Sequence, residues 1–301
     1  MLRNSKSETP VVEPKKSEIK KYQPSVFQSL AIGSAGGAGE VLINHPLWTL
    51  KTRKQEKLPS LLAVIKTEGA SLTPISRMLY CGVLPNMASM VPTTAIQVGL
   101  DRCFQKAFLQ DSNQVGITHK LGSAFVAGVG SALVSCPSEL VLISQAKLNL
   151  GNGLNGFYKS GTSVVQQYGM RTLYTGLTAT ALRDGIFSMF LLGVVPYSVV
   201  WMKMQFGDNA VADLSGKTLA GVGATVVSHS ADTIKAKQQA HANLKQKLGF
   251  IESAAQIYSK NGIQGFFAGG GWRGLRVISG LAIVSTVKEE AETYLAKRNL
   301  K

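Results

Sequence analysis

The sequence repeats one pattern three times, and this repetition constrains the fold more than any other feature. Three segments align in register: 33–55, 124–146 and 217–239. One aligned position in these segments holds Pro46, Pro137 and Ser230, which are 91 and then 93 residues apart. An aromatic-x-Gly triplet follows each segment, and its glycines, 94 and 93 residues apart, are Gly82, Gly176 and Gly269. Two independent markers with one period predict three copies of one supersecondary unit.

Four stretches of the chain carry no formal charge and are long enough to cross a membrane as helices. They are 22–39, 78–100, 121–138 and 185–202. Each has at least 18 residues, enough for a helix to span roughly 30 Å of hydrocarbon. Two weaker stretches, 218–230 and 277–287, are too short for hydropathy alone to assign them. Because charged residues make up only 16% of the chain, well below the usual share, the sequence predicts a membrane protein.

The composition argues against several other classes of protein. The net charge is +15, but the basic residues are scattered and accompany no zinc-finger, RNA-recognition or basic-zipper pattern. We therefore expect contact with anionic lipid rather than with nucleic acid. The three cysteines and four histidines show no metal-ligand or disulfide spacing. No nucleophile elbow, P-loop or dinucleotide fingerprint is found, so we expect neither an enzyme nor a metal site.

These repeats resemble the mitochondrial carrier family, whose signature P-x-[DE]-x-x-[KR] occurs once per repeat. The three copies here read P-L-W-T-L-K, P-S-E-L-V-L and S-A-D-T-I-K, each with one departure. The resemblance covers nearly everything after residue 25. It implies an all-α membrane protein of the mitochondrial inner membrane, with six transmembrane helices in a threefold pseudosymmetric bundle and short matrix-side helices. A polar, disordered tail over 1–25 then precedes repeats at 26–112, 117–207 and 213–301.

The glycines and prolines of the repeats have structural explanations. Small residues such as Gly37, Gly128 and Gly221 let helices approach closely in lipid. An interior proline removes a backbone donor and kinks a helix. We therefore expect hinges at Pro46, Pro137 and the equivalent Ser230.

The resemblance also implies a gate on the matrix side, in which each signature acid pairs with the base of another repeat. It pairs Glu139 with Lys235 and Asp232 with Lys51. The third pair is apolar, Trp48 with Leu142, and an apolar pair replaces an ion pair at little net cost in free energy. Family members place a glutamine brace beneath such bridges, where this chain has Gln55 and Gln239.

Family substrates bind seven residues after each turn glycine, and counting gives Ser89, Arg183 and Arg276. Arginine inside a membrane faces a wet cavity and binds carboxylate or phosphate through two parallel hydrogen bonds. Arg183 is followed by Asp184, as in family members that resemble amino-acid carriers, so Arg183 is expected to bind a carboxylate and Asp184 an amine. Alternatively, the two neutralise each other.

Two further polar residues, Glu40 and Gln97, are candidates to line the same cavity. The cytoplasmic-side motif has decayed, since its acid positions hold Asp101, Val195 and Lys288. We therefore expect a weak lock on that side. Cardiolipin is a possible structural lipid, bound at helix N-termini.

The predicted function is transport of a small metabolite by alternating access, as antiport of an anionic or zwitterionic solute such as an amino acid or carboxylate. Two alternatives stay open. One is a nucleotide carrier of the ATP/ADP type, although the R-R-R-M-M-M run of ADP/ATP carriers is absent after Asp232. The other is a non-transporting membrane adaptor with the carrier fold. We expect a monomer whose partners are the solute, the bilayer and cardiolipin.

Overall fold

The computed structural model describes residues 24–55, 75–76, 79–80, 82–108, 116–148, 153–240, 248–267 and 270–299. The regular secondary structure in these ranges is entirely helical, so the predicted all-α class is confirmed for the part of the chain that is described. The tail predicted over 1–25 lies almost wholly outside the described residues, because the description begins at residue 24.

Six long helical segments make up most of the described chain. They are α1 (Val26–Gln55), α4 (Val83–Phe108), α5 (Ile117–Leu148), the continuous run of α7 (Leu177–Ser188), π-helical η2 (Met189–Val194) and α8 (Val195–Phe206), then α9 (Ala210–Ala240) and α11 (Gly270–Asn299). The three hinge positions Pro46, Pro137 and Ser230 lie inside α1, α5 and α9. The signature motifs are therefore helix interiors, not loops.

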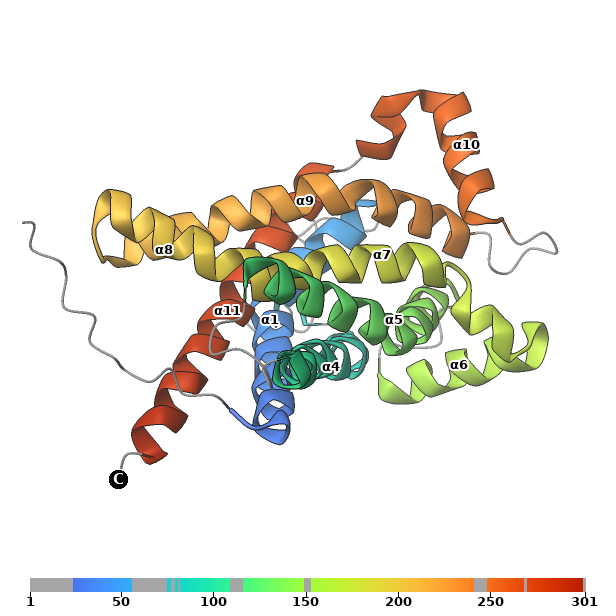
Figure 1. Ribbon diagram of the computed structural model, residues 1–301. Coiled ribbons are helices and arrows are strands. Elements are labelled where there is room, and N and C mark those ends of the chain that lie inside the picture. Colours follow the sequence, from blue (N-terminus) through green and yellow to red (C-terminus); the bar gives the residue numbers. More distant parts are fainter. Residues whose placement is uncertain are drawn as a thin grey trace, which may run out of the picture.

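The long segments pack in chain order around a closed ring. Helix α1 packs on α4, α4 on α5, α5 on α7, α7 and α8 on α9, α9 on α11, and α11 returns to α1. The short elements are α6 (Leu154–Tyr168), α10 (Phe250–Asn261) and the 3₁₀ helices η1 (Met170–Tyr174) and η3 (Ile263–Phe267). Figure 1 shows α6 and α10 on the side of the bundle away from α8 and the C-terminus. Three consecutive helical hairpins thus enclose one interior.

Three helical regions of the described chain are long and apolar enough to cross a membrane: Val26–Leu47, Ile117–Gln145 and Met170–Phe206. Helix α4, which contains most of the predicted span 78–100, is not among them. The reason is a set of polar side chains that lower its mean hydropathy. All of them are buried inside the bundle: Asn86, Ser89, Thr93, Thr94 and Gln97.

Two of the turn glycines have a backbone conformation that explains their residue type. Gly82 has φ of +82° and Gly176 has φ of +84°, in the left-handed region that side chains with a Cβ rarely adopt. Each directly precedes a long helix, α4 or α7. The third turn glycine, Gly269, lies outside the described residues. The aromatic-x-Gly triplets thus mark helix starts in the first two repeats.

The predicted close helix packing is present at equivalent glycines of all three repeats. A Cβ atom at Gly128 would lie 2.2 Å from the Asp184 carbonyl oxygen, and one at Gly221 would lie 2.8 Å from the Ile278 Cα. At Gly37 it would lie 3.0 Å from Thr94 Oγ1. In each repeat the first long helix therefore touches the backbone or a short side chain of the second, and at Gly128 and Gly221 there is no room for a methyl group.

We predict that Gly128→Ala destabilises the protein by about 1–3 kcal/mol, because an added methyl in a packed interior forces the backbone to shift. The control is Gly122→Ala in the same helix, where a Cβ would meet nothing within 4 Å. Thermal unfolding in detergent measures both variants. The explanation is wrong if the two substitutions change the melting temperature equally.

Candidate functional site

A central cavity of about 140 Å³ lies inside the ring of helices. Residues of α1, α4, α5, α7, α9 and α11 line it, so every repeat contributes. The lining residues are Glu40, Met90, Thr93, Thr94, Gln97, Glu139, Arg183, Asp184, Phe187, Asp232, Arg273, Arg276 and Val277. Charged side chains inside a helical bundle are costly in free energy unless they pair with one another, so we examined the ion pairs around this cavity.

Arg183 on α7 is the centre of that pairing. Its Nη1 and Nη2 donate to the two carboxylate oxygens of Glu139 at 2.9 and 2.8 Å, the bidentate geometry that suits guanidinium best. Its Nε donates to Asp184 Oδ1 at 2.8 Å, and Nη1 lies 3.6 Å from Asp232 Oδ1. One side chain thus contacts acids on α5, α7 and α9.

Asp184 has both carboxylate oxygens occupied. Arg183 binds Oδ1, and the Ser135 hydroxyl donates to Oδ2. Ser135 lies four residues before Glu139, so both project from one face of α5. Of the two possibilities for Arg183 and Asp184, the structure has them paired with each other.

A second group of ion pairs has its cations on α9 and α11. Lys235, only 3% exposed, pairs with Glu139. Asp232 accepts from Arg273 Nε at 3.1 Å. Arg273 also donates to Ser228 Oγ at 3.2 Å and to His229 Nδ1 at 3.3 Å. Sequence reasoning missed Arg273, although it lies three residues before Arg276 and so on the same helix face.

The predicted substrate residues do not all reach the cavity. Glu40, Gln97, Arg183, Asp184 and Arg276 line it, and Gln97 Nε2 also donates to Ser131 Oγ at 3.2 Å.

Ser89 is absent from the residues that line this cavity. It is buried, and among the described residues its Oγ has no hydrogen-bond partner. Thr93, one turn along α4, lines the cavity instead and donates to the Ser89 carbonyl.

The predicted gate is only partly within the described side chains. Glu139 and Lys235 are paired as the resemblance implies. The side chains of Trp48, Lys51 and Gln55 lie outside the described residues. The predicted pairs Trp48–Leu142 and Lys51–Asp232 and the predicted brace at Gln55 therefore stay predictions. In what is described, Asp232 pairs with Arg273 and Arg183.

Two further residues of the predicted gate and brace lie within the described part of the chain. Leu142 is half-buried on α5. Gln239 is buried, and its Nε2 has no hydrogen-bond partner among the described residues. Its role as a brace stays a prediction.

Comparison with known proteins identifies the family of this chain. A sequence model described as "Mitochondrial carrier protein" matches the chain three times, over residues 22–112, 113–205 and 207–299. The chain belongs to the mitochondrial carrier family. Membership makes it a metabolite carrier of the mitochondrial inner membrane.

Several relatives of this carrier are similar over almost their whole length. The human mitochondrial glycine transporter is 30% identical over 297 residues, covering 92% of this chain and 91% of the relative. Two proteins of Dictyostelium discoideum also match. Mitochondrial substrate carrier family protein Z is 26% identical (91% and 95% covered). The probable mitochondrial 2-oxodicarboxylate carrier is 25% identical (97% and 96% covered).

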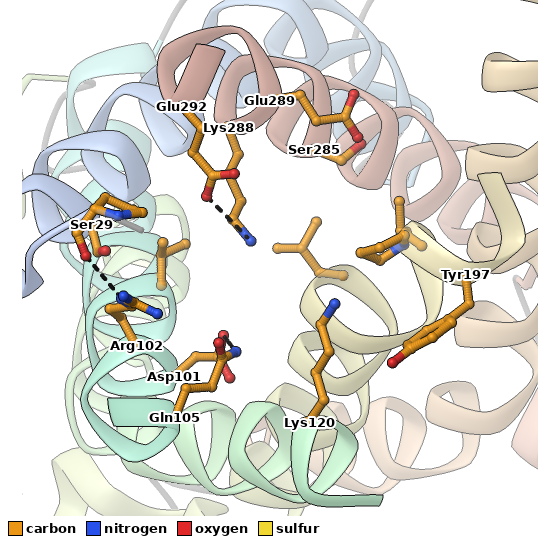
Figure 2. Close-up of a pocket in the computed structure, with 15 residues that line it drawn as sticks. Ser29, Asp101, Arg102, Gln105, Lys120, Tyr197, Ser285, Lys288, Glu289 and Glu292 are labelled. Carbon is orange, nitrogen blue, oxygen red and sulfur yellow. Dashed lines mark hydrogen bonds and ion pairs between the residues drawn. The ribbon is translucent and has the colours of Figure 1, made fainter. Parts of the chain in front are cut away.

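A larger cavity of about 340 Å³, here called the vestibule, opens where α1 and α5 begin and α4 ends. Figure 2 shows the ammonium groups of Lys120 and Lys288 pointing into it from α5 and α11. Asp101 accepts from Ser123 Oγ at 2.8 Å, while Lys288 lies 3.9 Å from Glu292. The carrier is thus hollow at this end. The ion-pair network of Arg183 lies beside the deeper cavity, whereas Lys217 pairs with Asp213 and with the vestibule residue Glu289.

We predict that Arg273→Gln destabilises the carrier by about 1–3 kcal/mol, because it removes the closest partner of the partly buried Asp232 carboxylate. Arg171→Gln is the control, since Arg171 is exposed on η1 and surface substitutions usually change stability by less than about 0.5 kcal/mol. Thermal unfolding of the purified carrier is the measurement. If Asp232→Asn adds its full effect on top of Arg273→Gln, the two residues are not coupled.

Proposed function

We propose that this carrier moves a small amino acid across the mitochondrial inner membrane by alternating access, and binds it in the central cavity. All six long helical segments cross the membrane in this proposal. The outward side chains of α9 support it, since Leu219, Val222 and Val226 are 49%, 46% and 58% exposed and their spacing puts them on one helix face. An apolar stripe on the outside of such a bundle suits contact with lipid.

The main support for an amino acid as the solute is the equal number of cations and carboxylates at the cavity. Four carboxylates line it: Glu40, Glu139, Asp184 and Asp232. Three guanidinium groups line it with them, and Lys235, bound to Glu139, makes four cations. A zwitterion enters such a site without changing its net charge, whereas a multiply charged anion would add negative charge that the four cations, already matched by four carboxylates, do not balance.

The size of the cavity supports the same class. A volume of about 140 Å³ is well below the roughly 300–1,000 Å³ typical of pockets for drug-sized ligands. A solute of few heavy atoms fits better than a nucleotide. The similarity to the human mitochondrial glycine transporter agrees with this choice.

We assign the two ends of the solute to the charges that have no ion pair. Among the described residues, no carboxylate lies within ion-pair distance of the Arg276 guanidinium, and no cation lies within that distance of Glu40. Both side chains line the cavity, from the neighbouring helices α11 and α1. Arg276 therefore binds the solute carboxylate and Glu40 its amine. Asp184, whose oxygens are already occupied, is a poorer acceptor for the amine than the sequence suggested.

Alternating access requires that the two sides close in turn. We take the network around Glu139 as the closed matrix gate and the vestibule as the open cytoplasmic side. Lys288 occupies an acid position of the decayed cytoplasmic motif, and it faces the same vestibule as Asp101 (Figure 2). Closure of this side then brings Asp101 and Lys288 together, in place of the pairs that the family motif specifies.

We predict that glycine and other small amino acids raise the melting temperature of the purified carrier, since a ligand that binds only the folded state stabilises it. Arg276→Gln abolishes the shift and uptake into liposomes, whereas Arg298→Gln, an exposed change in the same helix, leaves both intact. Stabilisation by nucleotides instead would support the nucleotide alternative. Absence of any shift and of any uptake would support the adaptor.

We also predict that Lys288→Asp slows uptake about tenfold, because it places two carboxylates at the closing vestibule and like charges repel. The charge swap Asp101→Lys with Lys288→Asp restores much of the rate. Lys297→Asp, an exposed change further along α11, controls for charge alone. Failure of the swap to recover any uptake argues against this pair.

A further inference from the structure

The third repeat has a buried lysine at its vestibule end, where the other two repeats have a small residue. Lys217 on α9 is only 2% exposed. Its ammonium group donates to Thr286 Oγ1 and Glu289 Oε2 on α11, each at 2.9 Å, and lies 2.7 Å from Asp213 Oδ2 on its own helix. An ammonium group has three hydrogens to donate. This charge is therefore fully paired, and its partners lie on both helices of one hairpin.

The first two repeats join the corresponding helix ends by an apolar contact. A Cβ atom added at Gly99 of α4 would lie 2.5 Å from Leu30 Cδ2 of α1. One added at Gly193 of η2 would likewise lie 2.5 Å from Leu121 Cδ2 of α5. In both hairpins, a leucine of the first helix therefore packs into the space that a glycine leaves on the second.

The third repeat differs at the aligned positions. Leu214 corresponds to the two leucines, but it is 58% exposed. Thr286 stands in place of the glycine, and Lys217 aligns with Gly33 and Ala124. The bond from Lys217 to Thr286 thus takes the place of the leucine-on-glycine contact.

The two kinds of contact differ in the free energy needed to separate the helices. Lipid tails are as apolar as leucine, so a leucine that leaves its glycine packs against lipid at little cost. Separation of α9 from α11 would instead remove two of the three acceptors of the Lys217 ammonium group, which is costly for a buried charge. The first two hairpins can therefore open at this end, whereas the third resists opening.

We infer that Lys217 is a positioning residue for transport, which holds the vestibule ends of α9 and α11 together in both states of the carrier while the other two hairpins open and close. The inference rests on the proposed function. Glu289 lines the vestibule next to Lys288, so its bond with Lys217 keeps this part of α11 on α9. Closure of the vestibule then moves Asp101 on α4 towards a stationary Lys288.

Pulsed electron paramagnetic resonance on the full-length carrier in liposomes tests this inference. Spin labels are attached to cysteines at equivalent exposed positions of the three repeats, in a carrier whose native cysteines are replaced by serine. The three labelled pairs are Phe27 with Lys106, Thr118 with Val200, and Val211 with Thr293. With glycine on both sides of the membrane, the distance distributions of the first two pairs are expected to broaden or shift, and that of the third pair to stay unchanged.

A variant rebuilt after the second repeat is the matched control. Lys217→Ala with Thr286→Gly reproduces Ala124 and Gly193, so Leu214 regains a glycine to pack on and no buried ammonium group is left. The two carboxylates that lose their partner are partly exposed and stay hydrated. Since an apolar contact can replace a buried ion pair at little net cost, the variant is expected to fold. Its third pair then broadens with glycine as the other two do.

The outcomes separate this inference from the function on which it rests. If glycine is taken up and the third pair changes as much as the other two, or no pair changes at all, the inference is wrong and the transport proposal stands. An unchanged third pair in the rebuilt variant overturns the inference equally. If that variant does not fold, Glu289→Gln replaces it, and it too broadens the third pair if the inference holds. If wild type binds neither glycine nor any other amino acid, the proposed function fails, and the inference with it.

Discussion

The pairing of Arg183 with acids from three helices is the interaction on which the arrangement of this bundle interior depends. Its guanidinium binds Glu139 and Asp184 and approaches Asp232. Charges in a membrane interior are tolerated when they are paired with one another, and Glu139 extends the pairing to Lys235. The relative positions of α5, α7 and α9 around the cavity are therefore coupled to the position of one side chain.

The repeat period and its two markers predicted three copies of one unit, and the resemblance to the carrier family supplied the all-helical class, which is confirmed for the described residues. A glycine such as Gly128 is required wherever two helix backbones approach too closely for a methyl group, and Gly176 is required by its positive φ. The site was predictable only in part. Counting from the turn glycines located Arg183 and Arg276 at the cavity, but it also selected Ser89, where the side chain that reaches the cavity is Thr93.

The ion-pair partners of each side chain could not be derived from the repeat period of the sequence, because they depend on the length and direction of individual side chains. Arg273 shows why. It occupies the same repeat position as Asn86, and the two make equivalent contacts, each donating to the imidazole before its hinge position, His229 or His45. The longer arginine side chain also reaches Asp232. A pattern that aligns the two residues therefore gives no sign that only one of them enters the ion-pair network.

This asymmetry gives the cavity a direction. The first repeat contributes Glu40 and neutral side chains such as Thr94, whereas all three arginines come from the second and third repeats. A threefold-symmetric site would offer an amino acid three equivalent orientations, whereas the proposed binding of its carboxylate to Arg276 and of its amine to Glu40 defines one.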